Sequence, residues 1–528
     1  GRGGAGFLVL DITDPAAPRH LYSILNDHTL HKVHVMDHNG NLNSYDYIAN
    51  SYALSSFNEA VKVTDNFQMS TGSMTCDATG NNQCYKSKTW TFPVRGVTKS
   101  DLTVILNGSS YNNFTVTTNS SGDTLLNFAT NITYYGGDPG DASKVSSELG
   151  VYIKPGSAQT GVLTQPEYDY SQLGETWSAP RIFRLPNNGA GDTNVEDDIY
   201  VAAMGGGFGA QFSGFGSNLT LVNLEDISYP GRVHNVIPIE DLSTNDIVNS
   251  TPGSSVVVTP DTARGVSFRG ALIYLNDLEG KITKFNLTNM SNDGKGNAIA
   301  LYDNTTLFTA GSTSTNGRYM YHSMDATIGQ TTNTLWLFAG TGDYERIADS
   351  QAGNDNLLLG IADPDYPFYR NVNTPTRAYD LSKCKNTTND SSGASCPQLT
   401  GDKGWYIQLK NSAKVTAEPT VSSGLVYFPI YKPSSSVNKC SLGDAFICAV
   451  DDECGTNISS KLGANTGATK NEKCKYVGQG VLSRIVTFAG KIFANIAGQS
   501  TQNKKDLVVL QGATSDVSTY RSSWRNNF

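Results

Sequence analysis

The sequence has little charge, and most of the charge that it has is negative. Charged residues make up 16% of the 528 residues and the formal net charge is −9, whereas soluble domains average roughly 25% charged residues. The chain also lacks a run of Lys and Arg, the feature that nucleic acid and anionic membrane surfaces attract. We therefore predict that nucleic acid is not a partner.

Long apolar runs are missing as well. None approaches the roughly 20 residues that a membrane-spanning helix needs, which predicts a chain without a membrane span. The sequence has no initiator Met and no signal-peptide pattern, and it opens inside an expected strand at residues 8–12. We expect a piece of a longer secreted protein whose targeting segment lies upstream.

Common catalytic motifs do not occur. The sequence contains no GxSxG elbow, no HExxH and no Walker loop, the motifs that carry nucleophilic, zinc and phosphate chemistry. The glycine-rich stretch 205–209 follows an expected strand but opens no helix, so it does not predict a phosphate cradle. The pattern favours a protein that is not an enzyme and has no catalytic residue.

Cysteine is present in an even number but without metal-binding spacing. No CxxC is followed by a second CxxC, which argues against zinc and favours disulfides in an extracellular compartment. Proximity in sequence predicts the bridges Cys76 to Cys84 and Cys384 to Cys396, while the last four cysteines allow three connectivities. The predicted disulfide residues are Cys76, Cys84, Cys384, Cys396, Cys440, Cys448, Cys454 and Cys474.

Short strands separated by turn residues dominate the chain. In the clearest example, residues 269–287, an apolar run is followed by turn residues at 276–280 and then by a period-2 alternation, the pattern of a β-hairpin. No helical pattern of convincing length appears. Many short strands favour a closed all-β architecture, and a β-propeller removes exposed sheet edges by radial repetition.

The texture changes between residues 66 and 165, where Thr, Ser and Asn alternate with apolar residues. Strands expected at 101–108, 114–117 and 124–128 predict a small β-sandwich-like domain inserted into a propeller loop. The predicted domains are the first propeller part at 1–65, the insert at 66–165 and the rest of the propeller at 166–528.

Asn-x-Ser/Thr sequons are frequent, as the high content of Asn, Ser and Thr makes them by chance. Four cluster in the insert and are the predicted glycosylation sites if the host has the machinery: Asn107, Asn113, Asn119 and Asn131. The other eight lie at Asn218, Asn249, Asn286, Asn289, Asn304, Asn386, Asn389 and Asn457.

One acidic loop has the alternate spacing of a calcium site. Asp192, Asn194, Glu196 and Asp198 place oxygen-bearing side chains at every second position, and calcium takes about six to eight oxygen ligands. The loop lacks the turn glycine and the distal bidentate Glu of an EF-hand. The alternative is a solvated turn before the strand expected at 199–201.

Five of the seven histidines, His20, His28, His31, His34 and His38, lie close together, which suggests a transition-metal or pH-sensitive site. In a hairpin over residues 32–47, His31 and His34 point to opposite faces and cannot share an ion. This geometry favours packed or solvent-facing histidines. Binding-surface candidates, each with strand packing as the alternative, are Tyr111, Tyr134, Tyr135, Tyr168, Tyr170, Tyr366 and Tyr369.

A set of short motifs occurs in a fixed order along the chain. They lie at residues 3–6 leading into 10–15, 176–180, 276–280, 340–342, 404–406, 417–419 and 523–525. In this order they resemble the C-terminal domain of the PilY family, the type IV pilus tip adhesins and pilus-biogenesis factors. The resemblance covers most of the chain except residues 66–165.

The resemblance implies a modified, about seven-bladed, quinoprotein-like β-propeller at the pilus tip or cell surface. It also implies minor pilins and a surface or host receptor as partners, with roles in pilus (fimbrium) assembly, attachment and twitching motility. The family's calcium loop falls at 261–271, where this chain has one carboxylate, Asp261, and two arginines, Arg264 and Arg269. We expect no calcium there.

Two other functions stay open. One is a propeller enzyme of the quinoprotein type, although its adjacent cysteine pair and regular Trp-bearing repeats do not occur and a fold does not confer a function. The other is a glycan-decorated filament or surface-layer component. Absorbance from a bound quinone would favour the first, and self-polymerisation of the chain would favour the second.

Overall fold

The computed structural model describes only part of the chain. The described residues are 6–27, 32–46, 61–62, 73–74, 83–92, 97–119, 124–136, 149–154, 166–208, 216–240, 247–259, 268–293, 296, 298–347, 356–369, 379–390, 396–397, 401–434, 442–456, 473–498 and 507–512. Across these residues the chain forms strands and short 3-10 turns, at η2 (Lys99–Asp101), η3 (Pro166–Tyr168) and η5 (Leu381–Lys383), and no α-helix. The all-β prediction is confirmed.

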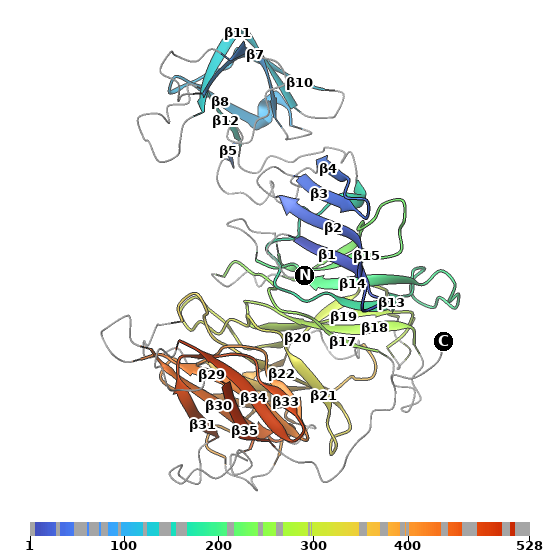
Figure 1. The fold of residues 1–528 in the computed structure, drawn as a ribbon, viewed down its shortest axis with the longest axis vertical. Helices are drawn as coiled ribbons and strands as arrows, with labels where there is room; N and C mark the ends of the chain where they lie inside the picture. The colour runs from blue at the N-terminus through green and yellow to red at the C-terminus, as the bar shows by residue number, and fades with distance from the viewer. Residues whose placement is uncertain are drawn as a thin grey trace. The chain divides into compact units, whose positions relative to one another are not determined.

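The chain divides into two compact units, residues 1–177 with 206–237 and residues 178–205 with 238–528. The first unit begins with an antiparallel sheet in the order β1 (Gly6–Asp11), β2 (Arg19–Asp27), β3 (Lys32–Asp37) and β4 (Leu42–Asp46) (Figure 1). Strand alternation buries one face, with Phe7, Ile24 and Val35 inside and Leu8 and Leu25 exposed.

The histidines of this sheet bond to neighbouring serines. His20 Nε2 lies 2.7 Å from Ser23 Oγ, and His34 Nδ1 lies 2.7 Å from Ser44 Oγ. Among the described residues, no histidine belongs to a group that could hold a metal ion. His28 and His31 lie outside the described residues.

The insert consists of two four-stranded sheets over one core (Figure 1). One sheet contributes Trp90, Leu126 and Phe128 to the core, and the other contributes Val104 and Val151. The predicted inserted β-rich domain is confirmed, while its bounds at 66 and 165 stay predictions. The sheets are ordered β10 (Phe114–Thr118), β11 (Thr124–Gly136), β7 (Gln83–Phe92), β6 (Ser73–Met74), and β5 (Val61–Lys62), β12 (Leu149–Ile153), β8 (Leu102–Leu106), β9 (Ser109–Ser110).

A two-residue turn joins β8 and β9. Asn107 and Gly108 adopt φ values of 51° and 76°, the left-handed conformation that a tight hairpin turn requires at both positions. The turn leaves Asn107 exposed at the tip of the hairpin. The remaining strands of the first unit are β15 (Asn218–Asn223) and β16 (Val233–Pro238).

Most tyrosines proposed for a binding surface are packed instead. Tyr168, Tyr170 and Tyr369 are no more than 2% exposed, and Tyr170 donates its hydroxyl hydrogen to the carbonyl oxygen of Gly231 (2.5 Å). Tyr111 packs in the insert core. The packing alternative is correct for these four, Tyr366 is half-buried against a core, and the side chains of Tyr134 and Tyr135 lie outside the described residues.

The second unit is a succession of antiparallel sheets. Each sheet has four or five strands. The strands are β13 (Arg181–Leu185), β14 (Ile199–Gly205), β17 (Val256–Val258), β18 (Gly270–Asn276), β19 (Lys281–Thr288), β20 (Asn304–Thr309), β21 (Asp325–Ile328), β22 (Leu335–Gly340), β23 (Leu357–Asp363), β24 (Tyr379–Asp380), β25 (Lys385–Asn386), β26 (Gly404–Gln408), β27 (Lys414–Val415), β28 (Thr420–Ser422), β29 (Leu425–Lys432), β30 (Asp444–Asp451), β31 (Cys474–Gln479), β32 (Val481–Leu482), β33 (Val486–Phe488), β34 (Lys491–Ala497) and β35 (Leu507–Gln511). In two of the sheets a short parallel strand lies at the edge, where β24 pairs with β20 and β25 pairs with β26.

The predicted hairpin at 269–287 is β18 and β19, which pair in continuous antiparallel register. The period-2 alternation of the sequence does not separate a buried face from an exposed one here, because every residue of β19 is buried. Its two lysines have internal partners: Lys284 Nζ lies 2.5 Å from Asp363 Oδ2, and Lys281 pairs with Asp277 and Glu279. A buried lysine is tolerated when it is paired in this way.

Apolar clusters join successive sheets of the second unit from the sheet of β18 onward. The sheet with β18 shares one core with the sheet of β22, through residues such as Leu272 and Leu337. The other face of β22 packs on the sheet of β29, and β29 in turn packs on β34, through residues such as Tyr427 and Ile492.

Hydrogen bonds also link the beginnings of the first strands in these sheets. Before β13, Ala179 N donates to Ser254 Oγ (2.7 Å), and Ser254 N, which precedes β17, donates to Ser323 Oγ before β21 (2.7 Å). Val421 N of β28 donates to Asp325 Oδ2 of β21 (2.8 Å). First strands lying side by side, with sheets packed face to face, are the blade arrangement of a propeller.

The disulfides differ from the sequence prediction. Cys396 pairs with Cys454, and Cys448 pairs with Cys474, the second pair lying directly opposite on β30 and β31. The predicted Cys384 to Cys396 bridge is wrong, because Cys384 is a buried free thiol in an apolar core. Burial raises its pKa to about 12. Cys76, Cys440 and the side chain of Cys84 lie outside the described residues.

Candidate functional site

The acidic loop lies between β13 and β14 and is shaped by its own side chains. Asp192 Oδ1 accepts a hydrogen bond from Asn194 N (2.8 Å), and Asn194 Oδ1 accepts one from Glu196 N (3.2 Å). Asp and Asn favour such turns because their short side chains reach the backbone two residues on. The alternate spacing seen in the sequence therefore builds consecutive turns.

Arg269, immediately before β18, lies on the carboxylates of this loop. Its Nε and Nη2 donate to the two carboxylate oxygens of Asp198 (2.8 and 3.0 Å), and Nη2 also donates to Asp192 Oδ2 (2.6 Å). The side chains of Asp192 and Asp198 are only 7% and 2% exposed. A planar guanidinium suits this bidentate geometry.

Further hydrogen bonds fix the loop to the β18–β19 hairpin. The carbonyl oxygens of Asp192 and Asn194 accept hydrogen bonds from Arg269 (3.0 and 2.8 Å). Asn289, just after β19, donates its side-chain amide to the carbonyl of Asp192 (2.8 Å) and accepts from Arg269 N (2.7 Å). The base of the β18–β19 hairpin therefore holds the loop through both backbone and side chains.

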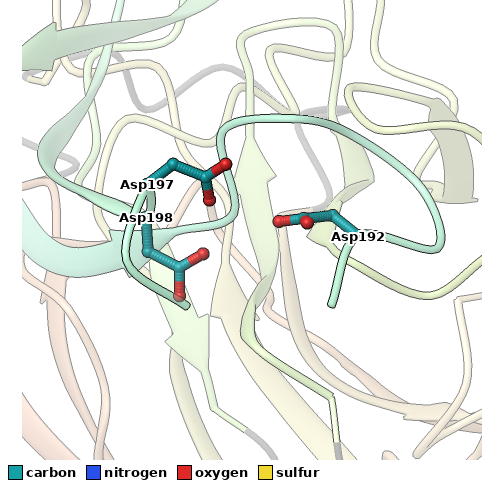
Figure 2. A group of neighbouring side chains, drawn as sticks. All are labelled: Asp192, Asp197 and Asp198. Atoms are coloured by element: carbon teal, nitrogen blue, oxygen red, sulfur yellow. The ribbon is translucent and has the colours of Figure 1, made fainter. Parts of the chain in front are cut away.

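The structure gathers a different acidic set from the predicted one. Asp192, Asp197 and Asp198 each place a carboxylate oxygen within 4.8 Å of the others, and Figure 2 shows the Asp192 carboxylate directed across the loop toward the other two. Glu196 is exposed and outside this group, and the side-chain oxygen of Asn194 is used in its turn. Of the four predicted residues, the structure brings the carboxylates of Asp192 and Asp198 together.

The three gathered carboxylates are neutralised in part by arginine. Arg184 Nε lies 3.8 Å from Asp198 Oδ2, so three carboxylates face two guanidinium groups. The hydrogen bond to Asp198 is the main cause that raises the pKa of Arg269. One oxygen, Asp197 Oδ1, is buried without a hydrogen-bond partner. Calcium binding by this loop stays a prediction.

Sequence reasoning missed Arg269 and Asp197. Arg269 counted only as a residue that spoils the family's calcium loop at 261–271, of which residues 261–267 lie outside the described part. Asp197 was left out because it breaks the alternate spacing. A signal was available for Arg269, because it comes directly before a strongly apolar strand. A charge next to a buried strand needs an opposite charge nearby, and β13, which leads into the acidic loop, contacts β18.

The predicted glycosylation sites of the insert are accessible. Asn107, Asn113 and Asn131 are exposed, and Asn119 is half-exposed. Glycosylation stays a prediction.

Among the residues that the structure describes, no helix is long and apolar enough to cross a membrane.

Comparisons with known proteins give structural similarities only. No family model and no curated protein matches the sequence. The chain is similar to the C-terminal domain of Pseudomonas aeruginosa PilY1, with 13% identity and a TM-score of 0.43 over 94% of this chain and 92% of that one. It is also similar to the WD40 domain of SCAP from fission yeast, with 8% identity and a TM-score of 0.26 over 93% and 94% of the two chains. Similarities this low leave the function to be argued from the residues.

Proposed function

We propose that this chain is a type IV pilus tip-associated adhesin that is not an enzyme. It supports pilus assembly, surface attachment and twitching motility from an extracellular position at the pilus tip or cell surface. The observation that carries this proposal is the ordered set of motifs that resembles the PilY family, from residues 10–15 to 417–419. Minor pilins and a surface or host receptor are the proposed partners.

The positions of the motifs support the proposal. Residues 276–280 form the turn of the central hairpin, residues 340–342 end β22, and residues 417–419 precede β28. Each motif therefore lies at a turn or strand end of a different part of the second unit, where backbone geometry restricts the choice of residue. Several motifs with separate structural roles match a family by chance less often than a single run of residues does.

The hydrogen bonds at the first strands favour a role other than catalysis. Ser254, Ser323 and Asp325, at or just before the starts of β17 and β21, each accept a hydrogen bond from a backbone N–H group of a neighbouring sheet. These bonds join one sheet to the next, which supports a structural role for the three side chains.

The insert is the proposed contact surface for a receptor. It has its own core, so its outward-facing side chains are not needed for packing. Its exposed Thr, Ser and Asn residues offer adaptable hydrogen bonding. Two disulfides in the second unit fit an oxidising, extracellular environment. These features support attachment as the function of the whole chain.

Immunogold labelling of native cells with an antibody against this chain tests the proposal. We expect gold at pilus ends, and none on a strain from which the gene has been deleted. Gold along whole filaments would overturn the tip assignment in favour of a structural filament component. Gold confined to the periplasm of cells without pili would overturn it in favour of the enzyme.

A further inference from the structure

A cavity of about 460 Å³ opens among several turns of the second unit. Its walls are the β21–β22 turn at 330–332, Gly424 between β28 and β29, the segment that follows β30, and Pro397 beside the Cys396–Cys454 disulfide. Ligand pockets in proteins typically measure about 300–1,000 Å³. The cavity is therefore large enough for a ligand group.

Three consecutive acidic residues line this cavity, and two of them have structural roles. The carboxylate oxygens of Glu453 accept hydrogen bonds from Thr331 N and Thr332 N (2.7 Å each). Asp451 Oδ1 accepts hydrogen bonds from Glu453 N (3.1 Å) and Cys454 N (2.8 Å). These bonds fix the segment to the neighbouring turn.

The third residue, Asp452, is 7% exposed. Its backbone is bonded on both sides, to Gly424 O (3.1 Å) and to Trp405 Nε1 (2.9 Å). Its carboxylate accepts only backbone N–H groups, and no described side chain forms an ion pair with it. Burial, together with the charges of Asp451 and Glu453, raises the pKa of Asp452 to about 6.

Lys473, the next lysine in the described part of the chain, does not supply a counter-charge to Asp452. Lys473 Nζ donates to the carbonyl oxygens of Gly455 (3.0 Å) and Thr387. The charges that act on Lys473 come from Asp390 and Lys385 and not from the cavity. A buried carboxylate without an opposite charge is unfavourable, and an external cation removes that cost.

The shape of the site distinguishes between kinds of cation. A metal ion needs several ligand atoms converging on one point, and within the described residues the acids of the cavity do not form such a group. An organic cation needs a single carboxylate for its N–H donors and an apolar wall for its stem. Asp452 supplies the first, and Pro397 with the disulfide supplies the second.

We propose that this cavity binds a guanidinium or ammonium group carried on an aliphatic stem, with the Asp452 carboxylate as its counter-charge. The group comes either from an Arg or Lys side chain of a partner protein or from a free alkylamine. The inference does not depend on the pilus role, because it rests on the cavity and on Asp452 alone.

Calorimetric titration of the full chain at pH 7.5 tests the proposal. The probe is acetyl-glycyl-arginyl-glycine amide, and its control contains citrulline, which has nearly the same shape without the charge. We expect the arginine peptide to bind and the citrulline peptide not to bind. Asp452→Asn should weaken binding at least tenfold, because a charge-assisted bond becomes a neutral one. Asp444→Asn, at the other end of β30, should leave binding unchanged.

The design separates lost binding from lost folding. Asp452→Asn removes a buried unpaired charge, so this variant should unfold at the same temperature as the parent or higher. Equal binding of both peptides, unchanged binding by Asp452→Asn, or no binding of any cation would overturn the proposal. Binding of agmatine without the peptide supports the cavity and assigns a free amine as the source. Calcium binding that is lost in Asp452→Asn would overturn the organic cation.

Discussion

The second unit contains two acidic segments that differ in how their charge is compensated. In the loop at 192–198, the guanidinium of Arg269 lies on Asp192 and Asp198. In the segment at 451–453, backbone N–H groups satisfy two carboxylates, and Asp452 has no described ion-pair partner. The first segment is neutralised in part by a cation of the same chain, and for the second we propose a cation from elsewhere.

The comparison shows that a run of acidic residues does not itself define a binding site. The loop at 192–198 contains four carboxylates and the segment at 451–453 contains three, and both lie at turns that follow or precede a strand. The two segments differ because Arg269, 71 positions away from Asp198 in the sequence, donates a hydrogen bond to the first one. Whether an acidic cluster is available to a ligand is therefore decided by tertiary structure, and removal of each stabilising element tests the distinction.

The largest effect should follow from removing the disulfide beside the cavity. Replacing Cys396 and Cys454 with serine opens a covalent loop with a sequence separation of 58, and loop-closure entropy predicts a loss of about 4 kcal/mol of unfolding free energy. Binding of the arginine peptide should fall in the same variant, because one wall of the cavity is no longer fixed. Urea unfolding and calorimetry measure the two effects.

The control for this variant is Cys384→Ser, which changes a buried thiol but no bridge. It should leave peptide binding unchanged. Peptide mapping without reductant should recover the Cys396–Cys454 and Cys448–Cys474 pairs and a free Cys384. A recovered Cys384–Cys396 pair would restore the prediction from sequence proximity and remove the disulfide from the cavity wall.

A smaller loss should follow from removing the internal cation of the other segment. Arg269→Ala leaves Asp192 and Asp198, both nearly buried, without their main counter-charge. Breaking a buried pair leaves an uncompensated charge, but the Arg269 side chain is 23% exposed and solvent screens part of the effect. We expect a loss of about 2 kcal/mol, measured by urea unfolding in calcium-free buffer.

Calcium sharpens the same experiment. The oxygens of Asp192, Asp197 and Asp198 lie close enough to share an ion once Arg269 is removed. Millimolar calcium should therefore restore part of the stability that Arg269→Ala loses, and it should leave the stability of the parent unchanged. Arg184→Ala is the matched control, because its guanidinium is 3.8 Å from Asp198 and half-exposed. Equal losses in the two arginine variants would contradict the role assigned to Arg269.

Local patterns were sufficient to predict the strands of this chain. The hairpin of β18 and β19 follows from an apolar run, turn residues and an alternation, all within 19 residues. The two-sheet insert likewise follows from the change in composition and from short alternating segments. Strand formation depends on neighbours in sequence, so a reading of one stretch at a time can find it.

Long-range partners could not be predicted in the same way. Proximity in sequence favoured Cys384 as the partner of Cys396, whereas Cys454 lies next to it in space. The sequons at Asn218, Asn249 and Asn286 look like those of the insert, yet these residues are 2%, 5% and 0% exposed. Asn249, for example, donates to Asp277 (3.1 Å). Burial depends on which sheet packs on which, and a single sequence does not contain that information directly.

The last predicted effect has the opposite sign, because it is a gain in stability on removing the charge of Asp452. The pKa of Asp452 is raised from the ordinary value of 3.8 to about 6, so the folded chain holds this proton more tightly than the unfolded chain does. Its ionisation therefore destabilises the fold as the pH rises from about 4 to above 6. Asp452→Asn should therefore be more stable than the parent at pH 7.5 and nearly equal to it at pH 4, since the penalty is absent when the carboxyl group is protonated. Urea unfolding at both pH values measures this gain, with Asp444→Asn as the control. A gain of equal size at pH 4 would show that packing, and not an unpaired charge, distinguishes Asp452.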